Sequence, residues 1–263
     1  MRTKPTIADL RAGRGTMQRS MIFVLTAEEA AAADEAGIDM LSIHGGVMSA
    51  AHRRAAPNCF IMSGIGFGSY TDPDDAVRRA FTLLEMGADA IYCVASLSTI
   101  SRLADEGIPV VSHVGLVPSK ATWTGGFRAV GKTADSATQV WRHVQRLESA
   151  GVFGSEIEVV PEAVATEIAR RTSVFMISMG AGSGCDAQYL FAEDIVGSNR
   201  GHYPRHAKRY RDFAVEYDRL QQERIAAFRE YIADIASGAF PACKHLVGIA
   251  EPELQGFLRS LES

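Results

Sequence analysis

A chain of 263 residues, 47% hydrophobic and 22% charged, has the size and composition of a globular protein with a substantial core. Its net charge of −4 argues against a nucleic-acid-binding protein, which would be basic, and the one basic run, residues 205–211, is interpreted as a solvated helix face. The first residues lack the apolar segment of a secretory signal, and no apolar run reaches the length of a membrane span. We therefore expect a cytoplasmic protein that binds neither nucleic acid nor membrane.

One local pattern recurs along the chain: a helical segment ends in a glycine, and a β-branched apolar run begins shortly afterwards. The glycines are Gly37, Gly87, Gly107 and Gly151. A helix C-terminus favours a left-handed residue, which glycine adopts without strain. The strands that follow are short and continuously apolar, which indicates burial on both faces. Strands that alternate with helices in this way indicate parallel βα units.

The pattern predicts eight strands. They are expected at residues 21–26, 40–44, 59–65, 90–95, 109–114, 156–160, 174–179 and 192–196. That many βα units in a chain of this length favour a closed (β/α)₈ TIM barrel, of the α/β class, over an open doubly wound sheet. Residues 205–237 show long helical periodicity with many charges and end at Ser237-Gly238. We expect one domain over residues 1–263, in which residues 205–263 form a helical C-terminal extension.

The active site of a βα barrel lies at the C-terminal ends of its strands. His113 and Glu158 are the leading candidates there, because each lies in an otherwise apolar strand and a buried carboxylate is costly unless it is paired or functional. A hydrogen-bonded core histidine and a structural ion pair are the alternative interpretations. The other candidates at this edge are His44, which is alternatively a loop residue, Cys93, which is alternatively a small buried hydrophobe, Tyr92, and the strand exit Gly180, Ala181 and Gly182.

The segment 108–132 resembles the most characteristic stretch of the ketopantoate hydroxymethyltransferases (3-methyl-2-oxobutanoate hydroxymethyltransferases). It consists of an apolar strand, His-x-Gly-Leu-x-Pro, and a Gly-Gly-aromatic-Arg turn. Further matches follow in order along the chain at residues 56–59, 150–151, 158–161, 180–182, 201–205 and 238–241. This family belongs with the phosphoenolpyruvate mutase and isocitrate lyase barrels.

The resemblance implies a reaction of pantothenate biosynthesis on a small 2-oxo acid. In that reaction, 3-methyl-2-oxobutanoate forms an enolate, which takes a hydroxymethyl unit from the co-substrate 5,10-methylenetetrahydrofolate. The resemblance places Glu158 at the glutamate that removes the C3 proton, and His113 at the substrate-binding histidine. It also implies a homo-oligomer, since the family forms decamer-type rings.

The sequence departs from the family at its metal site, where Mg²⁺ holds the keto and carboxylate oxygens of the substrate. His44, followed by Gly45, stands at one aspartate ligand and Gly64 at the other. Tyr92 stands at the lysine that binds the substrate carboxylate, and Val94 at a nearby glutamate. We therefore expect the family's Mg²⁺ ligands to be absent, with His44, Gly45, Gly64 and Tyr92 contacting substrate instead.

A bound cation contributes several kcal/mol to an enolate-like transition state, so its loss needs a replacement. His44 and Tyr92 can act as hydrogen-bond donors, or a softer ion such as Zn²⁺ can be held by His44, Cys93, His113 and Glu158. Three functions follow: a hydroxymethyltransferase-like enzyme, a metal-independent C–C lyase or aldolase on another oxo acid, or a non-catalytic binding relative. The buried Glu158 argues against the third, because an idle buried carboxylate is destabilising.

Overall fold

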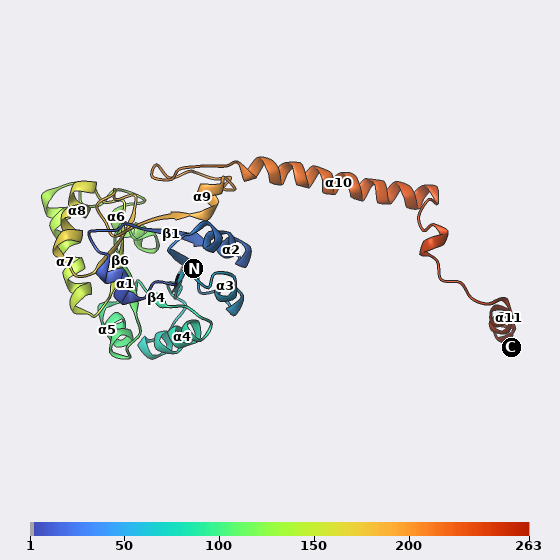
Figure 1. Ribbon diagram of the computed structural model, residues 1–263, viewed down its shortest axis with the longest axis horizontal. Helices are drawn as coiled ribbons and strands as arrows, with labels where there is room; N and C mark the ends of the chain where they lie inside the picture. Colours follow the sequence, from blue (N-terminus) through green and yellow to red (C-terminus); the bar gives the residue numbers. More distant parts are fainter. Residues whose placement is uncertain (1–2, 263) are drawn as a thin grey trace. The chain divides into compact units, whose positions relative to one another are not determined.

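The computed structural model describes residues 3–262 and contains a closed barrel of eight parallel strands, in which each strand pairs with its neighbours in sequence (Figure 1). The (β/α)₈ class predicted from the sequence is thereby confirmed. The strands are β1 (Arg19–Val24), β2 (Met40–His44), β3 (Phe60–Gly64), β4 (Ala90–Tyr92), β5 (Val110–Gly115), β6 (Gly154–Glu158), β7 (Phe175–Met179) and β8 (Ala187–Phe191).

Helices follow the strands and surround them. They are α1 (Ile7–Ala12), α2 (Ala27–Ala36), α3 (Ala50–Ala55), α4 (Pro73–Glu85), α5 (Leu97–Asp105), α6 (Ala121–Thr124), α7 (Ala134–Ser149), α8 (Glu162–Arg171) and α9 (Ala192–Val196), with a 3₁₀ turn η1 (Pro118–Lys120) before α6. The four glycines expected after helices have φ values of 90°, 102°, 75° and 88° in chain order, so their predicted left-handed conformation is confirmed.

The eighth strand differs from the prediction. Residues 192–196 form the helix α9, and the strand is the preceding segment, Ala187–Phe191. The first turn of α9 carries Glu193 and Asp194, which interact favourably with the positive end of the helix, and the left-handed Gly197 ends it. The strand was missed because it contains the polar Gln188 and is only partly buried, unlike the continuously buried strands β6 and β7.

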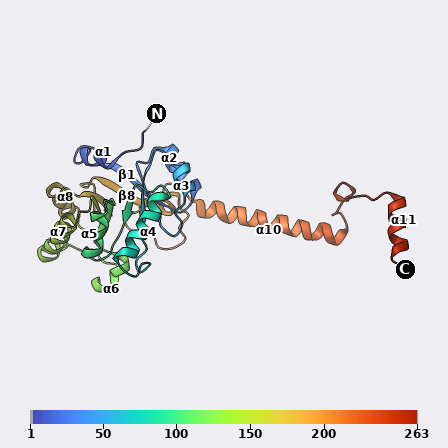
Figure 2. The ribbon, with the colours of Figure 1, turned by 90° about the horizontal axis from the view of Figure 1, so that it is seen from below.

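The core has two layers. Side chains that point into the barrel form one apolar cluster, and those between the strands and the helices form a second, larger one. The interior cluster includes Leu10 of α1, which packs with Phe60, Phe153 and Phe175. Figure 2 shows α1 at one end of the barrel and α6, which follows β5, at the other. The N-terminal end of the barrel is therefore filled by apolar side chains, and the polar residues of the interior lie toward the opposite end.

The chain divides into two compact units, Met1–Arg211 and Asp212–Ser263. The second unit contains α10 (Phe213–Ser237), the 3₁₀ turn η2 (Cys243–His245) and α11 (Glu251–Ser260). The predicted helical extension is thus present, and α10 ends at Ser237 as expected. It begins eight residues later than predicted, since residues 205–212 are not helical and the Tyr210 N–H donates to the Ile195 carbonyl instead.

The second unit exposes many apolar side chains. Over its described residues, 212–262, no side chain is buried. Large apolar side chains recur along one stripe of α10 at helical spacing, namely Phe213, Tyr217, Leu220, Phe228, Tyr231, Ile232 and Ile235, all of which are exposed. Among residues 3–262, no helix is both long and apolar enough to cross a membrane.

Candidate active site

Three ionisable side chains meet inside the barrel, on the adjacent strands β5 and β6. His113 lies in the middle of β5, and its register partner on β6 is Glu156. Glu158 follows two residues later and therefore points to the same face of the sheet. Their relative exposures are 3%, 4% and 8%, so two carboxylates and one imidazole share a nearly solvent-free interior.

The imidazole of His113 bridges the two carboxylates. Its Nδ1 lies 3.1 Å from Glu156 Oε2, and its Nε2 lies 3.3 Å from Glu158 Oε2. The Leu116 carbonyl oxygen is 2.7 Å from Nε2, and the Tyr92 hydroxyl is 2.8 Å from Nδ1. Both ring nitrogens therefore face acceptors, an arrangement that suits an imidazolium with two N–H donors.

The electrostatics agree with that geometry. Burial by itself lowers the pKa of His113, but hydrogen bonds and charge attraction from Glu156 and Glu158 outweigh it and raise the pKa to about 9. His113 is therefore a cation at neutral pH. Burial raises the pKa of Glu156, and the neighbouring Glu158 adds to this, while hydrogen bonding to His113 opposes it. When both acids are ionised, the group carries one more negative charge than positive charge.

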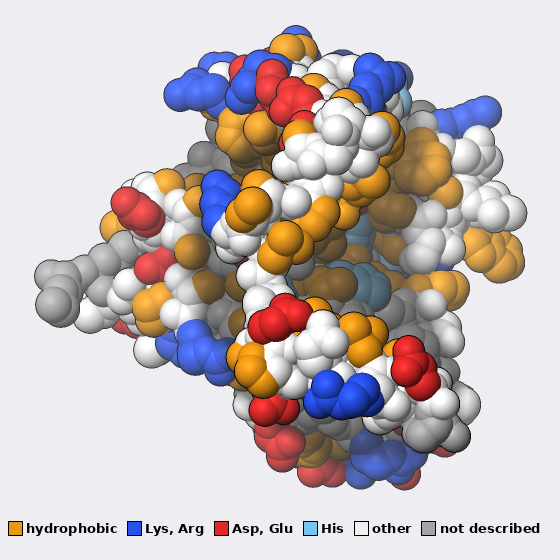
Figure 3. Space-filling model, turned by 90° about the vertical axis from the view of Figure 1, so that its right-hand side faces the viewer, with side chains coloured by type: hydrophobic (Ala, Val, Ile, Leu, Met, Phe, Trp, Pro, Cys, Tyr) orange, Lys and Arg blue, Asp and Glu red, His pale blue; other side chains and the backbone are white. Residues whose placement is uncertain are grey.

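A cavity of about 220 Å³ opens beside this group. Its lining combines the three ionisable residues with tyrosines and apolar side chains, namely Phe23, Ser42, Ile43, His44, Gly64, Tyr92, His113, Pro118, Glu156, Glu158, Met179, Tyr189 and Phe191. Several of these residues are the last of their strands, which places the cavity at the C-terminal end of the barrel. Figure 3 shows a face of the molecule that is hollowed, with histidine inside the hollow and mainly hydrophobic side chains around it.

Two tyrosines line the same cavity, and the Tyr92 hydroxyl is hydrogen-bonded to Glu156. Burial and the charges of Glu156 and Glu158 raise the pKa of both Tyr92 and Tyr189 well above the ordinary value of 10. Their hydroxyl groups therefore remain protonated and can donate hydrogen bonds to a negatively charged oxygen. Tyr189, on β8, is also hydrogen-bonded to Ser42 on β2, two strands away in the barrel.

Two members of the site were not singled out in the sequence. Glu156 stands two residues before Glu158, and the Glu-x-Glu spacing in a buried strand is the signal that places both on one face. His206 packs against Gly180, where an added Cβ would lie 2.7 Å from His206 Nδ1. Burial lowers the pKa of His206, while the charge of Glu158 opposes this effect. His206 was not predicted as a site residue because it is far from β6 in the sequence.

Three of the predicted substrate-binding residues line the cavity, namely His44, Gly64 and Tyr92, but Gly45, Cys93 and the Gly180–Gly182 turn do not. Cys93 belongs to the outer apolar layer, between the barrel and its helices, so the four side chains considered for Zn²⁺ do not converge. An added Cβ at Gly182 would collide with the Glu162 side chain at 2.3 Å, and Ala181 is buried in the outer layer. The Gly180–Gly182 turn thus accommodates neighbouring side chains. Across residues 3–262, no cluster of three or more His, Cys, Asp or Glu suits a metal ion.

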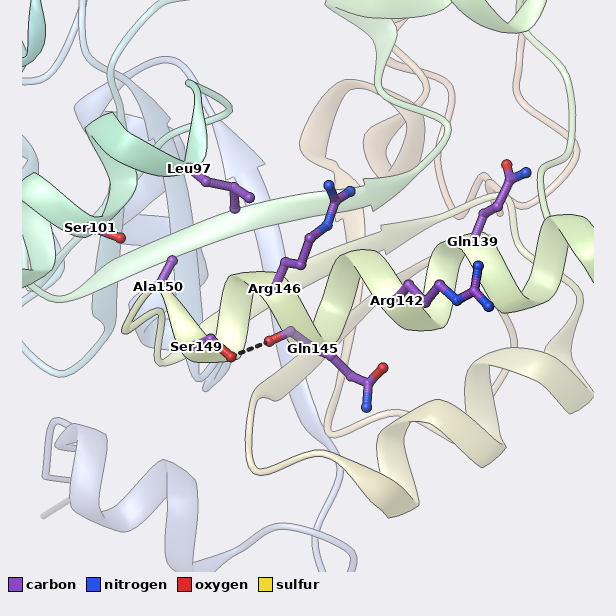
Figure 4. A pocket seen from close by; sticks show the side chains of 8 residues that line it. All are labelled: Leu97, Ser101, Gln139, Arg142, Gln145, Arg146, Ser149 and Ala150. Atoms are coloured by element: carbon purple, nitrogen blue, oxygen red, sulfur yellow. Dashed lines mark hydrogen bonds between the residues drawn. The ribbon is translucent and has the colours of Figure 1, made fainter.

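A second cavity, of about 360 Å³, adjoins the first and shares His44 and Gly64 with it. Gly45, the remaining predicted substrate-binding residue, lines this second cavity. A larger, open depression lies on the outer surface between α5 and α7, and Figure 4 shows its lining. The depression is lined by Leu97, Ser101, Gln139, Arg142, Gln145, Arg146, Ser149 and Ala150, none of which is an acid, a histidine or a cysteine. Among these three cavities, only the first is lined by His113 and the buried acids.

The residues at the mouth do not fit the Mg²⁺ ion that the sequence resemblance implies. Mg²⁺ requires oxygen ligands in octahedral geometry. At the two ligand positions, Gly64 has no side chain, and the His44 ring offers nitrogen, with Nδ1 already accepting the Gly46 N–H at 3.0 Å. The carboxylates of Glu156 and Glu158 are engaged with His113. We therefore assign no chemical step to a metal ion.

Comparison with known proteins agrees with these observations. A family model described as ketopantoate hydroxymethyltransferase matches residues 46–243. The chain is 33% identical to a 3-methyl-2-oxobutanoate hydroxymethyltransferase of Kosmotoga olearia, over 87% of this chain and 92% of that protein. It is 35% identical to the Pyrobaculum arsenaticum protein of the same name, over 73% of this chain and 71% of that one.

Among solved structures, a putative phosphonomutase from Burkholderia cenocepacia has the same fold, with a TM-score of 0.56 at 12% identity, covering 70% of this chain and 92% of that one. A putative lyase/mutase from the same organism has a TM-score of 0.53 at 10% identity, covering 70% of this chain and 80% of that one. The sequence matches are much closer than these and extend over most of the chain. Together with the barrel, they show that the chain belongs to the ketopantoate hydroxymethyltransferase family.

Proposed function

We propose that the protein is a hydroxymethyltransferase-like enzyme that forms an enolate from a small 2-oxo acid at the mouth of its barrel. The observation that carries the proposal is the position of Glu158, the last residue of β6, which lines the cavity 3.3 Å from His113. A carboxylate held in a largely apolar cavity is a suitable general base for a carbon acid. The family's substrate, 3-methyl-2-oxobutanoate, is the substrate we propose first.

In the proposed reaction, the Glu158 carboxylate removes the proton from the carbon next to the keto group. The electron pair of the broken C–H bond forms the enolate double bond, and the negative charge moves to the keto oxygen. Water adds to the one-carbon unit of 5,10-methylenetetrahydrofolate and its C–N bonds break, which releases formaldehyde and tetrahydrofolate. The enolate carbon then attacks the formaldehyde carbon, and the resulting alkoxide takes up a proton from Glu158 to become the hydroxyl group. This reaction is the one that the names of the curated relatives describe, and it would serve pantothenate biosynthesis.

His113 and Glu156 are assigned supporting roles. The imidazolium of His113 lies 3.3 Å from Glu158 and holds its carboxylate in place at the cavity. Glu156, on the other side of the ring, keeps His113 charged and fixes its orientation. Glu156 is thus a positioning residue that acts through His113.

The negative charge of the enolate requires donors, since the Mg²⁺ positions are unsuited to that ion. Tyr92 provides a hydroxyl that stays protonated and lines the cavity. His44 provides a second donor, because its Nδ1 accepts the Gly46 N–H and the proton of a neutral ring must then be on Nε2. A well-placed donor of this kind contributes about 3–4 kcal/mol to an oxyanionic transition state.

A second candidate is a metal-independent C–C lyase or aldolase that acts on another oxo acid. The observation that favours it is the replacement of the metal ligands and the carboxylate-binding lysine by His44, Gly64 and Tyr92. The same base and donors would serve both reactions, since both pass through an enolate. The two candidates differ in the acid that is bound and in the use of a folate co-substrate.

We also propose that the chain forms a homo-oligomer. The support is the exposed apolar stripe of α10, since apolar patches of this extent favour burial against a partner. Light scattering of the wild type and of a Phe228→Glu, Ile232→Glu variant tests this. We expect the variant to form a smaller species, and an unchanged mass would show that the stripe is not an interface.

The function is tested by deuterium exchange at C3 of 3-methyl-2-oxobutanoate in D₂O, followed by NMR. This measurement reports enolate formation without the folate co-substrate. Glu158→Gln should slow exchange by about a hundredfold or more, because it removes the base. Glu35→Gln, at an exposed position of α2, is the matched control and should leave the rate unchanged. Exchange that is as fast in Glu158→Gln as in the wild type would remove Glu158 from its role.

Exchange with other 2-oxo acids but not with 3-methyl-2-oxobutanoate would favour the lyase or aldolase. In that case product analysis with and without 5,10-methylenetetrahydrofolate separates the two candidates. A hydroxymethyltransferase consumes the folate compound in proportion to product, whereas a lyase or aldolase leaves it unchanged.

A further inference from the structure

The second cavity at the barrel mouth has no role in proton removal, yet it adjoins the reacting site. His44 and Gly64 line both cavities. The carboxylates and tyrosines of the first cavity do not line the second, which is bordered by the loops after β2 and β3 and by α4. A ligand that reaches from one cavity to the other therefore passes His44.

The walls of the second cavity differ along its length. Near His44 it is formed by backbone at Gly45, Gly46 and Gly66, where the absence of side chains leaves room for a chain of ligand atoms. Farther along, Leu83 and Met86 of α4 give it an apolar side. These features suit the methylene carbons of an extended molecule.

A cation and hydroxyl groups complete the lining. The Arg79 side chain, which is 49% exposed, borders the cavity together with Ser69 and Thr82. Arg79 is paired with Asp75 through Nε, at 3.3 Å, and among residues 3–262 its two terminal nitrogens have no hydrogen-bond acceptor. A guanidinium with such nitrogens binds a carboxylate through charge-assisted hydrogen bonds.

We propose that the second cavity binds the distal part of an elongated 2-oxo acid that ends in a carboxylate, with Arg79 as the partner of that carboxylate. This inference rests on the proposed function, because the keto end of the same molecule lies beside Glu158. His44, which lines both cavities, then stands at the middle of the ligand. A 2-oxo dicarboxylic acid that is longer than 3-methyl-2-oxobutanoate is accordingly a further substrate of the same site.

Calorimetric titration of the intact protein with matched pairs of acids tests the proposal. The first pair is 2-oxoadipate and 2-oxohexanoate, which have the same chain length and differ in a terminal carboxylate or methyl group. A second pair, 2-oxopimelate and 2-oxoheptanoate, has a longer chain, so that its terminal group lies farther from the keto group. We expect at least one dicarboxylate to bind about tenfold more tightly than its partner. Equal affinities within both pairs, or no binding of either dicarboxylate, would overturn the proposal.

Two variants connect any preference to this cavity. Arg79→Gln should abolish the preference for the dicarboxylate and leave the affinity for the monocarboxylate unchanged. Arg78→Gln is the matched control, because Arg78 is the preceding residue of α4, pairs with the same Asp75 at 3.8 Å and does not line the cavity. A preference that survives Arg79→Gln, or falls equally in Arg78→Gln, would assign it to another site.

Gly66→Ala tests whether the ligand extends past His44 into the second cavity. An added Cβ at Gly66 would lie 3.6 Å from His44 Nε2 and 3.5 Å from Ser69, which are ordinary contact distances, so the fold should tolerate it. We expect weaker binding of the dicarboxylate and unchanged binding of pyruvate, which is short enough for the first cavity. Unchanged dicarboxylate binding would show that the ligand does not pass His44.

The outcomes separate this inference from the proposed function. Dicarboxylate binding that depends on Arg79, without exchange at the carbon next to the keto group, would retain the second cavity and reject the enolate chemistry. Exchange with 3-methyl-2-oxobutanoate, without any preference for dicarboxylates, would do the reverse.

Discussion

His113 and Glu156 are opposite each other in the register of β5 and β6, and 3.1 Å separates Nδ1 of the histidine from Oε2 of the acid. Both side chains point into the barrel, where little solvent reaches them. This pair places a fixed positive charge beside Glu158 without any metal ion. The predictions below follow from it and from the cavity around it.

Removing the charge of Glu156 should lower the pKa of His113. Glu156→Gln keeps a hydrogen-bonding group of similar size and loses the attraction that helps to hold the pKa at about 9. We expect a decrease of about one pH unit or more, since a close opposite charge shifts a pKa by that amount. NMR titration of the ring signals measures it. The signals of His143, whose pKa is lowered to about 4 mainly by burial, serve as an internal reference. A His113 pKa that is the same in both proteins would contradict the assigned role.

The stability of the fold should decrease as the pH rises from about 6.5 to about 9. The folded-state pKa of His113 is raised from 6.5 to about 9, so its stabilising contribution is fully present below 6.5 and is lost as the pH passes through 9. The raised pKa of Glu156 acts in the same direction at lower pH. The contribution of His113 is on the order of 3 kcal/mol. Urea unfolding at pH values below 6.5 and above 9 measures this decrease in stability. In His113→Gln, the free energy of unfolding should change little over the same pH range.

Loss of the Tyr92 hydroxyl should slow the reaction far more than it destabilises the fold. Tyr92→Phe removes a donor that faces the reacting oxygen, and we expect exchange to slow by about a hundred- to a thousandfold. The lost hydrogen bond to His113 should lower the free energy of unfolding by only about 1 kcal/mol. Tyr70→Phe is the control, since Tyr70 is partly buried against the outer layer. Equal rates in the two variants would exclude Tyr92 as a donor.

Proton exchange by the wild type should not respond to Mg²⁺ or to EDTA, because His44 and Gly64 occupy the positions of the ligands. The double variant His44→Asp, Gly64→Asp should acquire Mg²⁺ affinity, seen as a rise in melting temperature with added Mg²⁺. A side chain at Gly64 is sterically feasible, since its Cβ would lie 3.4 Å from Tyr92 Cδ1. Loss of wild-type activity in EDTA would refute the metal-free mechanism.

Several parts of the fold were predictable because their signals are local. Gly37, Gly87, Gly107 and Gly151 each end a helix and are followed by a buried strand, and this repetition indicates parallel βα units. His113 could be located because a polar residue in the middle of an apolar strand is unusual. These inferences need only neighbouring residues in the sequence.

Other parts depend on tertiary structure and could not be predicted. Strand β6 was expected at residues 156–160, but it ends at Glu158 because Val159 adopts a positive φ of 49°. Glu158 therefore lies at the mouth of the barrel, and Glu156 occupies the buried position next to His113. The contact of His206 with Gly180, and the orientation of Cys93 toward the outer layer, depend on packing between segments distant in sequence.

The packing of Leu10 against the interior aromatic side chains has a consequence for how reactants exchange. Because apolar side chains close that end of the barrel, ligands enter and leave the cavity that contains Glu158 at the C-terminal end. A large co-substrate bound at the barrel mouth would keep a small oxo acid in the cavity until the co-substrate dissociates. The rate of turnover would then depend on how fast reactants and products pass the barrel mouth, where the loops after β2 and β3 lie.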